Sequence, residues 1–212
     1  MTPARGRLIA LEGVDGSGKS TQATILAERL GALLTFEPGA TELGRALRRL
    51  LLEPGHQALH ERAEALLMAA DRAQHVAEVV GPALDAGRVV VTDRFSPSTL
   101  AYQGYGRGLQ VPELRQLVEW ATGGVAADLT VVVDVPLAIA RGRIEHASAD
   151  RLERLDEAFF SRVREGYLTL AAQDPDRWAV VDGVGSVEAV AAAVRGVVEK
   201  RLGVEGVDAH RS

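Results

Sequence analysis

Apolar residues along this chain follow two patterns, short continuous runs and longer stretches with helical spacing. The runs have the length of β-strands and cover residues 8–11, 33–36, 89–92, 129–133 and 179–181. The helical stretches cover residues 18–30, 41–52, 60–85, 112–121, 136–146, 155–173 and 186–201. Because a run such as 131–133 contains no polar residue, the strands suit a parallel sheet with helices on both faces. The pattern therefore predicts a doubly wound α/β fold.

No feature of the sequence divides the chain into two domains. The 212 residues contain no repeat, low-complexity tract or linker, and single α/β domains commonly reach this length. We expect one domain over residues 1–202. Residues 203–212 lack apolar periodicity, so we expect a flexible tail there.

A glycine loop joins the first predicted strand to the first predicted helix. Residues 13–20 read Gly-Val-Asp-Gly-Ser-Gly-Lys-Ser, the phosphate-binding loop (P-loop) pattern G-x-x-x-x-G-K-[ST]. Backbone N–H groups in such a loop converge on phosphate oxygens at the positive end of a helix. We expect Lys19 to reach the β- and γ-phosphates of ATP and Ser20 to ligate Mg²⁺. The predicted ATP-binding residues are Gly13, Val14, Asp15, Gly16, Ser17, Gly18, Lys19, Ser20 and Thr21.

Lysine is rare in this chain, which strengthens the interpretation of the loop. Lys19 and Lys200 are its only lysines, and the other members of the Lys and Arg class are all arginine. The compact ammonium of lysine fits a tight phosphate loop better than the wide, planar guanidinium of arginine.

Composition argues against several other classes of function. The net charge of −5 gives no general attraction to nucleic acid or anionic membranes. The absence of cysteine excludes disulfides, thiolate metal sites and catalytic thiols. His56 and His60 lie four residues apart beside a Pro-Gly break, without a third ligand nearby, so the histidines predict no metal cluster. Because the sequence shows neither a signal peptide nor an apolar run of about 18 residues, we expect a cytoplasmic protein.

Asp93 and Arg94 directly follow the third predicted strand. An acidic residue at the carboxyl end of a buried strand lies on the ligand-binding edge of a parallel sheet, where Asp93 can hold Mg²⁺ directly or through water. Motor and transporter ATPases commonly carry a glutamate at the next position to polarise water. The cation of Arg94 instead suits a second phosphorylated substrate, although a salt bridge at the strand end is an alternative. Residues 96–104 then add hydroxyls, an aromatic ring and the amide of Gln103, which can pair with the edge of a base.

These motifs together resemble those of bacterial thymidylate kinases. The matching segments occur in family order and spacing from about residue 7 to residue 182. They are residues 12–21, 37–41, 69–75, 93–95, 98–104, Pro112 and 150–153. The P-loop alone is shared by many proteins, whereas residues 93–104 combined with the Glu-Pro-Gly at 37–39 are far more specific.

The resemblance implies a phosphotransferase that moves the γ-phosphoryl group of ATP to dTMP with Mg²⁺, giving dTDP and ADP on the route to dTTP. The implied fold is the P-loop NTPase type, with five parallel strands, flanking helices, a small lid at about 141–154 and assembly as a homodimer. The residue matching Asp15 faces the 3′-hydroxyl of dTMP in this family. The residues implied around dTMP are Asp15, Arg48, Met68, Arg72, Arg94, Ser98, Thr99, Tyr102 and Gln103.

Positioning and charge stabilisation dominate such a reaction, because the phosphate of dTMP is already anionic at pH 7. The candidates for this work are Lys19, Arg94, Asp15, Arg143 and Arg151. Gly16 stands where some family members carry a P-loop arginine, and members with glycine there supply the cation from the lid. We therefore expect Arg143 and Arg151 to act, with Arg141 behind them.

The chain departs from the family pattern at three further positions. The family usually has arginine, glycine and phenylalanine where this chain has Phe36, Ala40 and Met68. Methionine is flexible and polarizable, so Met68 can still cover a ring face. We expect altered or weaker packing against the base.

Several alternatives stay open at this point. The acceptor can be another monophosphate such as dUMP, and a regulatory module without catalysis would bind ATP yet make no dTDP. A guanine-nucleotide switch is excluded because neither lysine lies in an Asn-Lys-x-Asp motif, and Arg94 disfavours an assembly ATPase. The individual side chains also have ordinary structural roles available, as solvated arginines on helices for Arg48, Arg72, Arg143 and Arg151 and as core packing for Thr99 and Tyr102.

Overall fold

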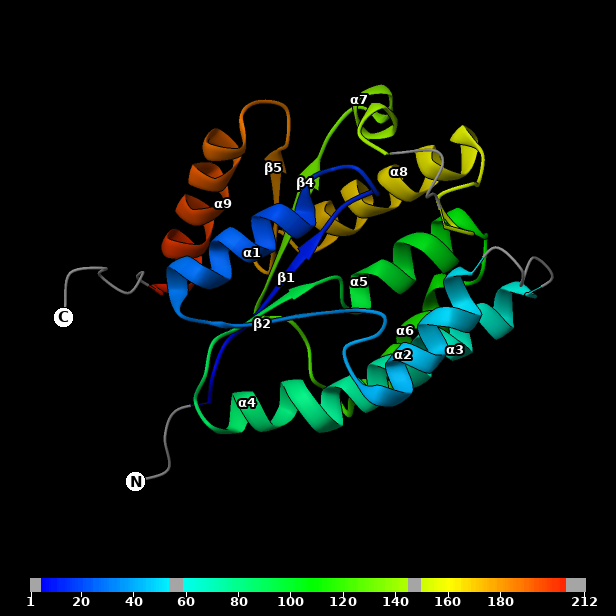
Figure 1. The fold of residues 1–212 in the computed structure, drawn as a ribbon, viewed down its shortest axis with the longest axis horizontal. Coiled ribbons are helices and arrows are strands. Elements are labelled where there is room, and N and C mark those ends of the chain that lie inside the picture. Colours follow the sequence, from blue (N-terminus) through cyan, green and yellow to red (C-terminus); the bar gives the residue numbers. More distant parts are fainter. Residues whose placement is uncertain (1–4, 54–58, 145–149, 205–212) are drawn as a thin grey trace.

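The centre of the fold is a sheet of five parallel strands. The computed structural model describes residues 5–53, 59–144 and 150–204. The strand order is β2-β3-β1-β4-β5, and every neighbouring pair is parallel. The strands are β1 Leu8–Glu12, β2 Leu33–Phe36, β3 Val90–Asp93, β4 Leu129–Asp134 and β5 Trp178–Asp182. The five predicted strands and the doubly wound parallel arrangement are confirmed (Figure 1). Most of the predicted tail, residues 205–212, lies outside the described residues.

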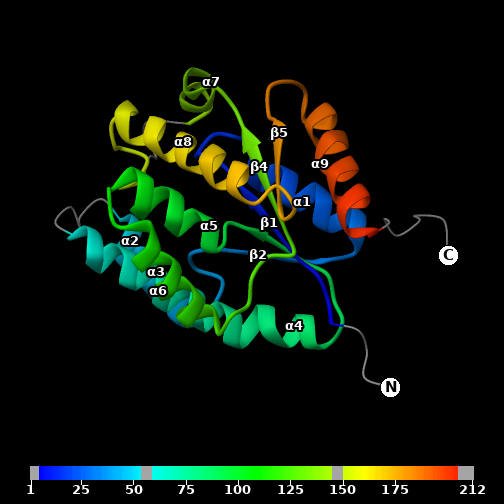
Figure 2. The same ribbon diagram turned by 180° about the vertical axis from the view of Figure 1, so that it is seen from behind.

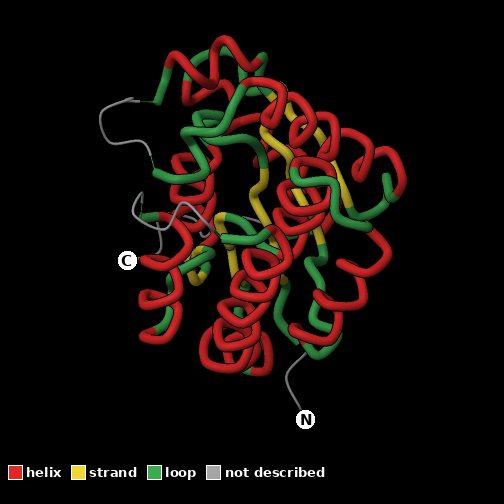
Figure 3. The backbone as a smooth tube through the Cα atoms, turned by 90° about the vertical axis from the view of Figure 1, so that its right-hand side faces the viewer, coloured by secondary structure: helices red, strands yellow, loops and turns green. Residues whose placement is uncertain are grey.

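Helices cover both faces of this sheet, so that the strands lie enclosed between them (Figure 3). The α-helices are α1 Lys19–Leu30, α2 Glu42–Leu52, α3 Glu61–His75, α4 Gly81–Asp85, α5 Ser96–Thr99, α6 Val111–Thr122, α7 Leu137–Gly142, α8 Glu157–Gln173 and α9 Val187–Leu202. Two π-helical segments, η1 Val76–Val80 and η2 Leu100–Gly106, continue α3 and α5. The alternation of strand and helix along the chain thus produces a three-layer structure.

Alternate side chains of each strand enter different cores, as the pleat of a strand requires. On one face, Ile9 and Leu11 pack with residues of α1 and α9. Figure 1 shows these two helices beside the strands. On the other face, Leu8 and Ala10 pack against η1 and α4, and Val132 packs against α8. Figure 2 shows this second face, with α8, α5 and α6 in the foreground. Both faces of the sheet are therefore buried, which explains the continuous apolar runs.

Three helical predictions differ from the structure. The predicted helix 60–85 contains the π-helical segment η1, because Pro82 has no N–H to donate to the carbonyl of Glu78 and its ring crowds that carbonyl. The predicted helix 136–146 ends at Gly142, a poor helix former, and residues 145–149 lie outside the described part of the chain. Residues 96–106, for which no separate helix is predicted, form α5 and η2. Glycines interrupt the apolar spacing of that segment.

The fold brings three loops to one edge of the sheet. The P-loop follows β1, the Glu-Pro-Gly segment follows β2, and Arg94 follows β3. Neighbouring parallel strands end at the same edge, where α/β proteins bind their ligands. No helix among the described residues is long and apolar enough to cross a membrane.

Candidate active site

The P-loop wraps the start of α1. Gly18 caps this helix with φ 93°, and Lys19 is its first residue. Gly13 has φ 141°, and a Cβ there would lie 2.6 Å from the carbonyl oxygen of Val133. The P-loop therefore has two features that phosphate binding requires, a backbone conformation that favours glycine and a helix N-terminus next to the loop.

Gly16 is pressed against α7. A Cβ at this position would lie 2.1 Å from the carbonyl oxygen of Ala140, and φ is 79°. A side chain at position 16 would require α7 to move. The loop in this arrangement has no room for an arginine of its own.

Asp15 connects two cations at the mouth of the loop. Its Oδ1 accepts hydrogen bonds from Lys19 Nζ at 3.2 Å and from Arg94 at 2.5 Å, and its Oδ2 accepts one from the Tyr102 hydroxyl at 2.8 Å. Burial would raise the pKa of Asp15, but the charges of Arg94 and Lys19 outweigh burial and hold that pKa well below its usual range. Asp15 is therefore an anion held between two cations.

Arg94 adopts a backbone conformation that is costly for a side-chain-bearing residue. Its φ is 71°, the only positive φ of a non-glycine residue in the described ranges. Such a conformation costs about 1–3 kcal/mol and persists only where the surroundings enforce it. The guanidinium lies 4.8 Å from the Tyr102 ring centroid and donates to Ser98 Oγ at 3.0 Å and to the Tyr167 hydroxyl at 3.2 Å.

Glu12 lies behind Arg94, and sequence reasoning did not identify it as a site residue. Its carboxylate accepts hydrogen bonds from the Phe95 N–H at 2.8 Å, the Ser98 hydroxyl at 2.7 Å and the Tyr167 hydroxyl at 2.8 Å. The same two hydroxyls accept hydrogen bonds from Arg94. Burial raises the pKa of Glu12, and the nearby charge of Arg94 opposes that rise. The hydroxyls of Ser98 and Tyr167 thus connect the buried carboxylate of Glu12 to the guanidinium of Arg94.

A cavity of about 440 Å³ opens beside the P-loop. All the residues implied around dTMP line this cavity: Asp15, Arg48, Met68, Arg72, Arg94, Ser98, Thr99, Tyr102 and Gln103. Lys19, Ser20 and Asp93 line it as well. The fold therefore brings the whole predicted acceptor site next to the phosphate loop, although its members come from four separate parts of the chain.

Arg72 is buried and makes one hydrogen bond through each of its three guanidinium nitrogens, so it is not a solvated helix arginine. Its Nε donates to Glu37 at 2.8 Å, and its two terminal nitrogens donate to Thr99 Oγ1 at 2.8 Å and the Phe95 carbonyl at 3.1 Å. Glu37 also contacts His75 Nδ1 at 2.8 Å. The Glu-Pro-Gly segment after β2 therefore acts as a support for Arg72, a role that its sequence did not indicate.

The residues expected to hold Mg²⁺ fit that ion. Asp93 Oδ1 is buried and has no hydrogen-bond partner among the described residues, and Asp93 and Ser20 line the same cavity. An unpaired carboxylate oxygen and a hydroxyl that line one cavity match the oxygen ligands that Mg²⁺ prefers. The described residues contain no group of three His, Cys, Asp or Glu side chains that could hold a metal alone. Mg²⁺ in this kind of site also takes ligands from substrate phosphates and water.

The two lid arginines occupy different environments. Arg143 follows α7 and donates to the carbonyls of Gly16 and Ser17, each at 3.3 Å. Arg151 instead donates to the Leu51 carbonyl at 2.7 Å and to Glu64 at 2.5 Å, and it is only 8 % exposed. The structure therefore brings Arg143, but not Arg151, to the P-loop. Arg141 lies beside a small cavity that Val14 also lines, and residues 145–149 of the predicted lid lie outside the described chain.

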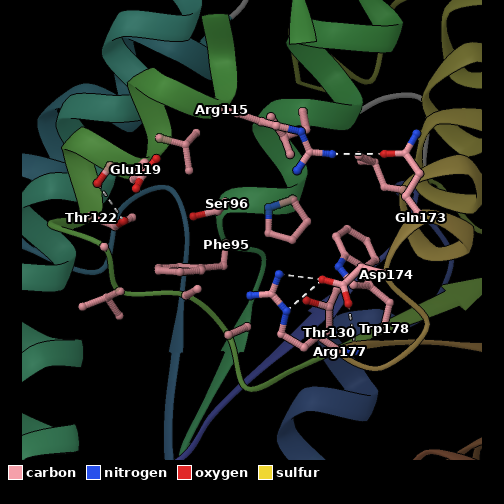
Figure 4. Close-up of a pocket in the computed structure, with 18 residues that line it drawn as sticks. Phe95, Ser96, Arg115, Glu119, Thr122, Thr130, Gln173, Asp174, Arg177 and Trp178 are labelled. Atoms are coloured by element: carbon pink, nitrogen blue, oxygen red, sulfur yellow. Dashed lines mark hydrogen bonds and ion pairs between the residues drawn. The ribbon is translucent and has the colours of Figure 1, made fainter. Parts of the chain in front are cut away.

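A second cavity, of about 820 Å³, lies between α6 and the end of α8 (Figure 4). Arg115 and Gln173 form a hydrogen bond at its rim, and Arg177 pairs with Asp174. None of the residues that the sequence assigns to phosphate, base or metal binding lines this cavity. Four of its polar side chains are therefore paired with one another, whereas the buried Ser96 hydroxyl has no hydrogen-bond partner among the described residues.

Comparisons with known proteins agree with this geometry. A sequence model described as thymidylate kinase matches residues 11–194. The thymidylate kinase of Cupriavidus necator is 46% identical over 204 residues, which are 92% of this chain and 97% of that protein. The thymidylate kinase of Desulforudis audaxviator is 47% identical over 195 residues, 89% of this chain and 88% of that protein. The crystal structure of thymidylate kinase from Ehrlichia chaffeensis superposes with a TM-score of 0.76 and 32% identity, covering 92% of this chain and 99% of that one.

Proposed function

This chain belongs to the thymidylate kinase family, and we propose that it holds dTMP in the cavity beside the P-loop and ATP on the loop itself. The reaction of the family is phosphoryl transfer from ATP to dTMP, so the chain is a phosphotransferase of the nucleoside monophosphate kinase type. The observation that carries the assignment of the acceptor site is the shared cavity. Residues that are far apart in the sequence, and that the family resemblance assigns to dTMP, all line it next to Lys19.

The first task of the site is to bring two phosphorylated anions together. Lys19 and Arg94 approach the same carboxylate, Asp15, so their cationic ends already lie close to one another. We assign Lys19 to the phosphates of ATP and Arg94 to the phosphate of dTMP. Their charges offset the repulsion between the anions, and the remaining catalytic effect comes from alignment of the acceptor oxygen with the γ-phosphorus.

Asp15 has a second role in this proposal. Its pKa lies well below the usual range, so the carboxylate accepts hydrogen bonds at neutral pH. When phosphates take over Lys19 and Arg94, Asp15 becomes an acceptor for the 3′-hydroxyl of the sugar. Tyr102, which donates to Asp15 at 2.8 Å, occupies the neighbouring position and leaves little room for a ribose 2′-hydroxyl.

Arg143 is our candidate for the cation that stabilises the transferred phosphoryl group. It lies on the carbonyls of Gly16 and Ser17 through hydrogen bonds of 3.3 Å, which are long and easily exchanged for a charged acceptor. Arg151 would have to leave Glu64 and the Leu51 carbonyl before it could act in this way. We therefore assign the larger share to Arg143.

Mg²⁺ belongs to this proposal as the ion that accompanies ATP. Ser20 and the unpaired oxygen of Asp93 are the groups that would hold it. When bound, the ion neutralises charge on the phosphate oxygens. The residues of the chain keep their tasks of binding and aligning the two nucleotides.

The experiment that tests the acceptor assignment is an ADP-release assay with dTMP, dUMP, dGMP, dCMP and AMP. We expect the highest kcat/KM with dTMP, and loss of turnover in Lys19→Met with the fold retained. ATP binding without any acceptor-dependent ADP would instead indicate a regulatory module. A higher kcat/KM with dUMP than with dTMP would move the acceptor assignment to that nucleotide.

We also propose that two copies of the chain pair through α2, α3 and α6. These helices pack side by side and expose large apolar residues, Leu43 and Leu50 on α2, Leu66 on α3 and Trp120 on α6. Trp120 is 83 % exposed, which is unusual for so large an apolar side chain. Sedimentation should give a dimer for the native chain and a monomer for Trp120→Glu, whereas Val187→Glu on α9 should stay dimeric.

Because the reaction uses ATP, we place the protein in the cytoplasm.

A further inference from the structure

Glu64 of α3 is a fully buried carboxylate outside the set of residues assigned to ATP, dTMP or Mg²⁺. It is 0 % exposed, and its oxygens accept hydrogen bonds from Arg107, Arg151 and Gln103. Arg107 and Arg151 approach Oε2 at 2.9 and 2.5 Å, and the Gln103 amide nitrogen approaches Oε1 at 3.0 Å. The carboxylate therefore pairs with two cations and also faces the amide of a residue that lines the nucleotide cavity.

The charge of Glu64 fixes the orientation of the Gln103 amide. An ionised carboxylate only accepts hydrogen bonds, so the nitrogen of Gln103 has to face it. Burial raises the pKa of Glu64, but its hydrogen bonds to Arg107, Gln103 and Arg151 outweigh burial and lower that pKa overall. The carboxylate therefore stays ionised at neutral pH. The amide oxygen of Gln103 is left without a hydrogen bond from any described residue, on a side chain that lines the nucleotide cavity.

A fixed acceptor in this cavity distinguishes between pyrimidine bases. Thymine and uracil carry an N3–H donor between two carbonyl oxygens, whereas N3 of cytosine is an acceptor. An amide oxygen accepts a hydrogen bond from the N3–H of thymine or uracil, but it repels the N3 lone pair of cytosine. Arg72, which also lines the cavity, supplies donors suited to a carbonyl oxygen of the base.

We propose that Glu64 is a positioning residue for base selection, which orients the Gln103 amide so that its oxygen accepts the N3–H of thymine and excludes cytosine. This inference rests on the proposed placement of dTMP in the cavity. Glu64 does not touch the nucleotide. It acts through Gln103, and its own pairing with Arg107 and Arg151 holds the carboxylate in place.

Glu64→Gln tests the orientation directly. The two shorter arginine contacts, at 2.9 and 2.5 Å, converge on Oε2, whereas Oε1 has one arginine contact of 3.3 Å. The new amide therefore keeps its oxygen at the Oε2 position and turns its nitrogen toward Gln103. Two facing NH₂ groups cannot hydrogen-bond, and Gln103 turns over to present its own nitrogen to the base. We expect the ratio of the dCMP and dTMP dissociation constants, measured by calorimetry, to fall about tenfold or more, as for one mispaired buried hydrogen bond.

Arg107→Gln is the matched control. It removes one partner of Glu64 but leaves the carboxylate facing Gln103. This variant should lose thermal stability and keep the native ratio of dissociation constants. A change of ratio in Arg107→Gln equal to that in Glu64→Gln would show general damage to the pocket and overturn the proposal.

Gln103→Leu keeps the test decisive if Glu64→Gln does not fold. It leaves Glu64 paired with both arginines and removes only the amide. Selectivity should fall as in Glu64→Gln, and a native ratio in Gln103→Leu would refute the proposal. Failure of the native chain to bind dTMP would instead contradict the proposed acceptor site. If the native chain prefers dTMP and Glu64→Gln retains that preference, only the role of Glu64 is wrong.

Discussion

Alanine substitution of Arg143 should lower activity and leave stability nearly unchanged, whereas alanine substitution of Arg151 should lower stability and leave most of the activity. Arg143 is exposed and makes contacts of 3.3–3.5 Å with backbone carbonyls, so its loss should change the free energy of unfolding by at most about 0.5 kcal/mol. If it stabilises the transferred phosphoryl group, Arg143→Ala should lower kcat by about 10³-fold. The expected variant is therefore stable and nearly inactive.

Arg151 should show the reverse pattern. Its guanidinium is buried and lies 2.5 Å from Glu64, which is itself fully buried. Removal of one partner of a buried ion pair costs about 3–5 kcal/mol of stability. Because Arg107 still compensates part of the Glu64 charge, we expect a cost of about 3 kcal/mol for Arg151→Ala. At about 2–4 °C per kcal/mol for a chain of this size, Tm should fall by about 6–12 °C. The kcat of the folded variant should stay within about tenfold of native.

Both quantities are accessible with the same samples. Coupled ADP release gives kcat, and thermal unfolding followed by circular dichroism gives Tm, with Arg195→Ala on the exposed side of α9 as a control for loss of one arginine. A stable Arg151→Ala with a large loss of kcat would show that Arg151 leaves Glu64 during the reaction. Near-native kcat in both variants would refute the assignment of the transferred phosphoryl group to a lid arginine.

Three further substitutions probe the support of the site. Glu12→Gln should lower kcat/KM for dTMP by about tenfold, because the new NH₂ group cannot accept the hydrogen bonds that the carboxylate of Glu12 accepts. A native kcat/KM in this variant would show that Glu12 does not support the site. Burial and the nearby charge of Glu37 raise the pKa of Asp71 to about 6, so the native chain should lose stability as pH rises from about 4 to 6. In urea unfolding at several pH values, Asp71→Asn should no longer lose stability over this range. If the free energy of unfolding of the variant falls with pH as steeply as that of the native chain, Asp71 is not the cause. Met68→Phe should bind dTMP more tightly in calorimetry, and an identical dissociation constant would discount Met68 as the cause of weaker base packing.

The strands and most helices could be predicted because their signal is local. A buried parallel strand needs apolar residues on both faces, so β1, β3 and β4 are visible as continuous runs. The P-loop is equally local, because the glycines, the lysine and the helix start are adjacent in sequence. The segment 96–106 carries Pro97 and glycines at 104 and 106, and its helical form depends on packing against α8 rather than on its own periodicity.

The supporting carboxylates could not be assigned in this way, because their partners are distant in the sequence. Glu12 bonds to Tyr167, and Glu64 bonds to Arg151, so no local window contains either pair. A glutamate in a helix is usually exposed, so the sequence gives no reason to expect that Glu64 is buried.

One sequence signal for these residues does exist on α3. Glu64, Met68, Asp71, Arg72 and His75 recur at intervals of three and four residues, which places them on one face of the helix. The charged members of this stripe are 0–2 % exposed. Leu66, on a different face, is 58 % exposed. The helix therefore turns a polar stripe inward and an apolar residue outward, the reverse of the usual amphipathic arrangement. Burial of so many ionisable groups is costly unless each is paired, so a polar stripe that faces inward on a helix is a signal for a buried polar cluster that the spacing of apolar residues alone does not give.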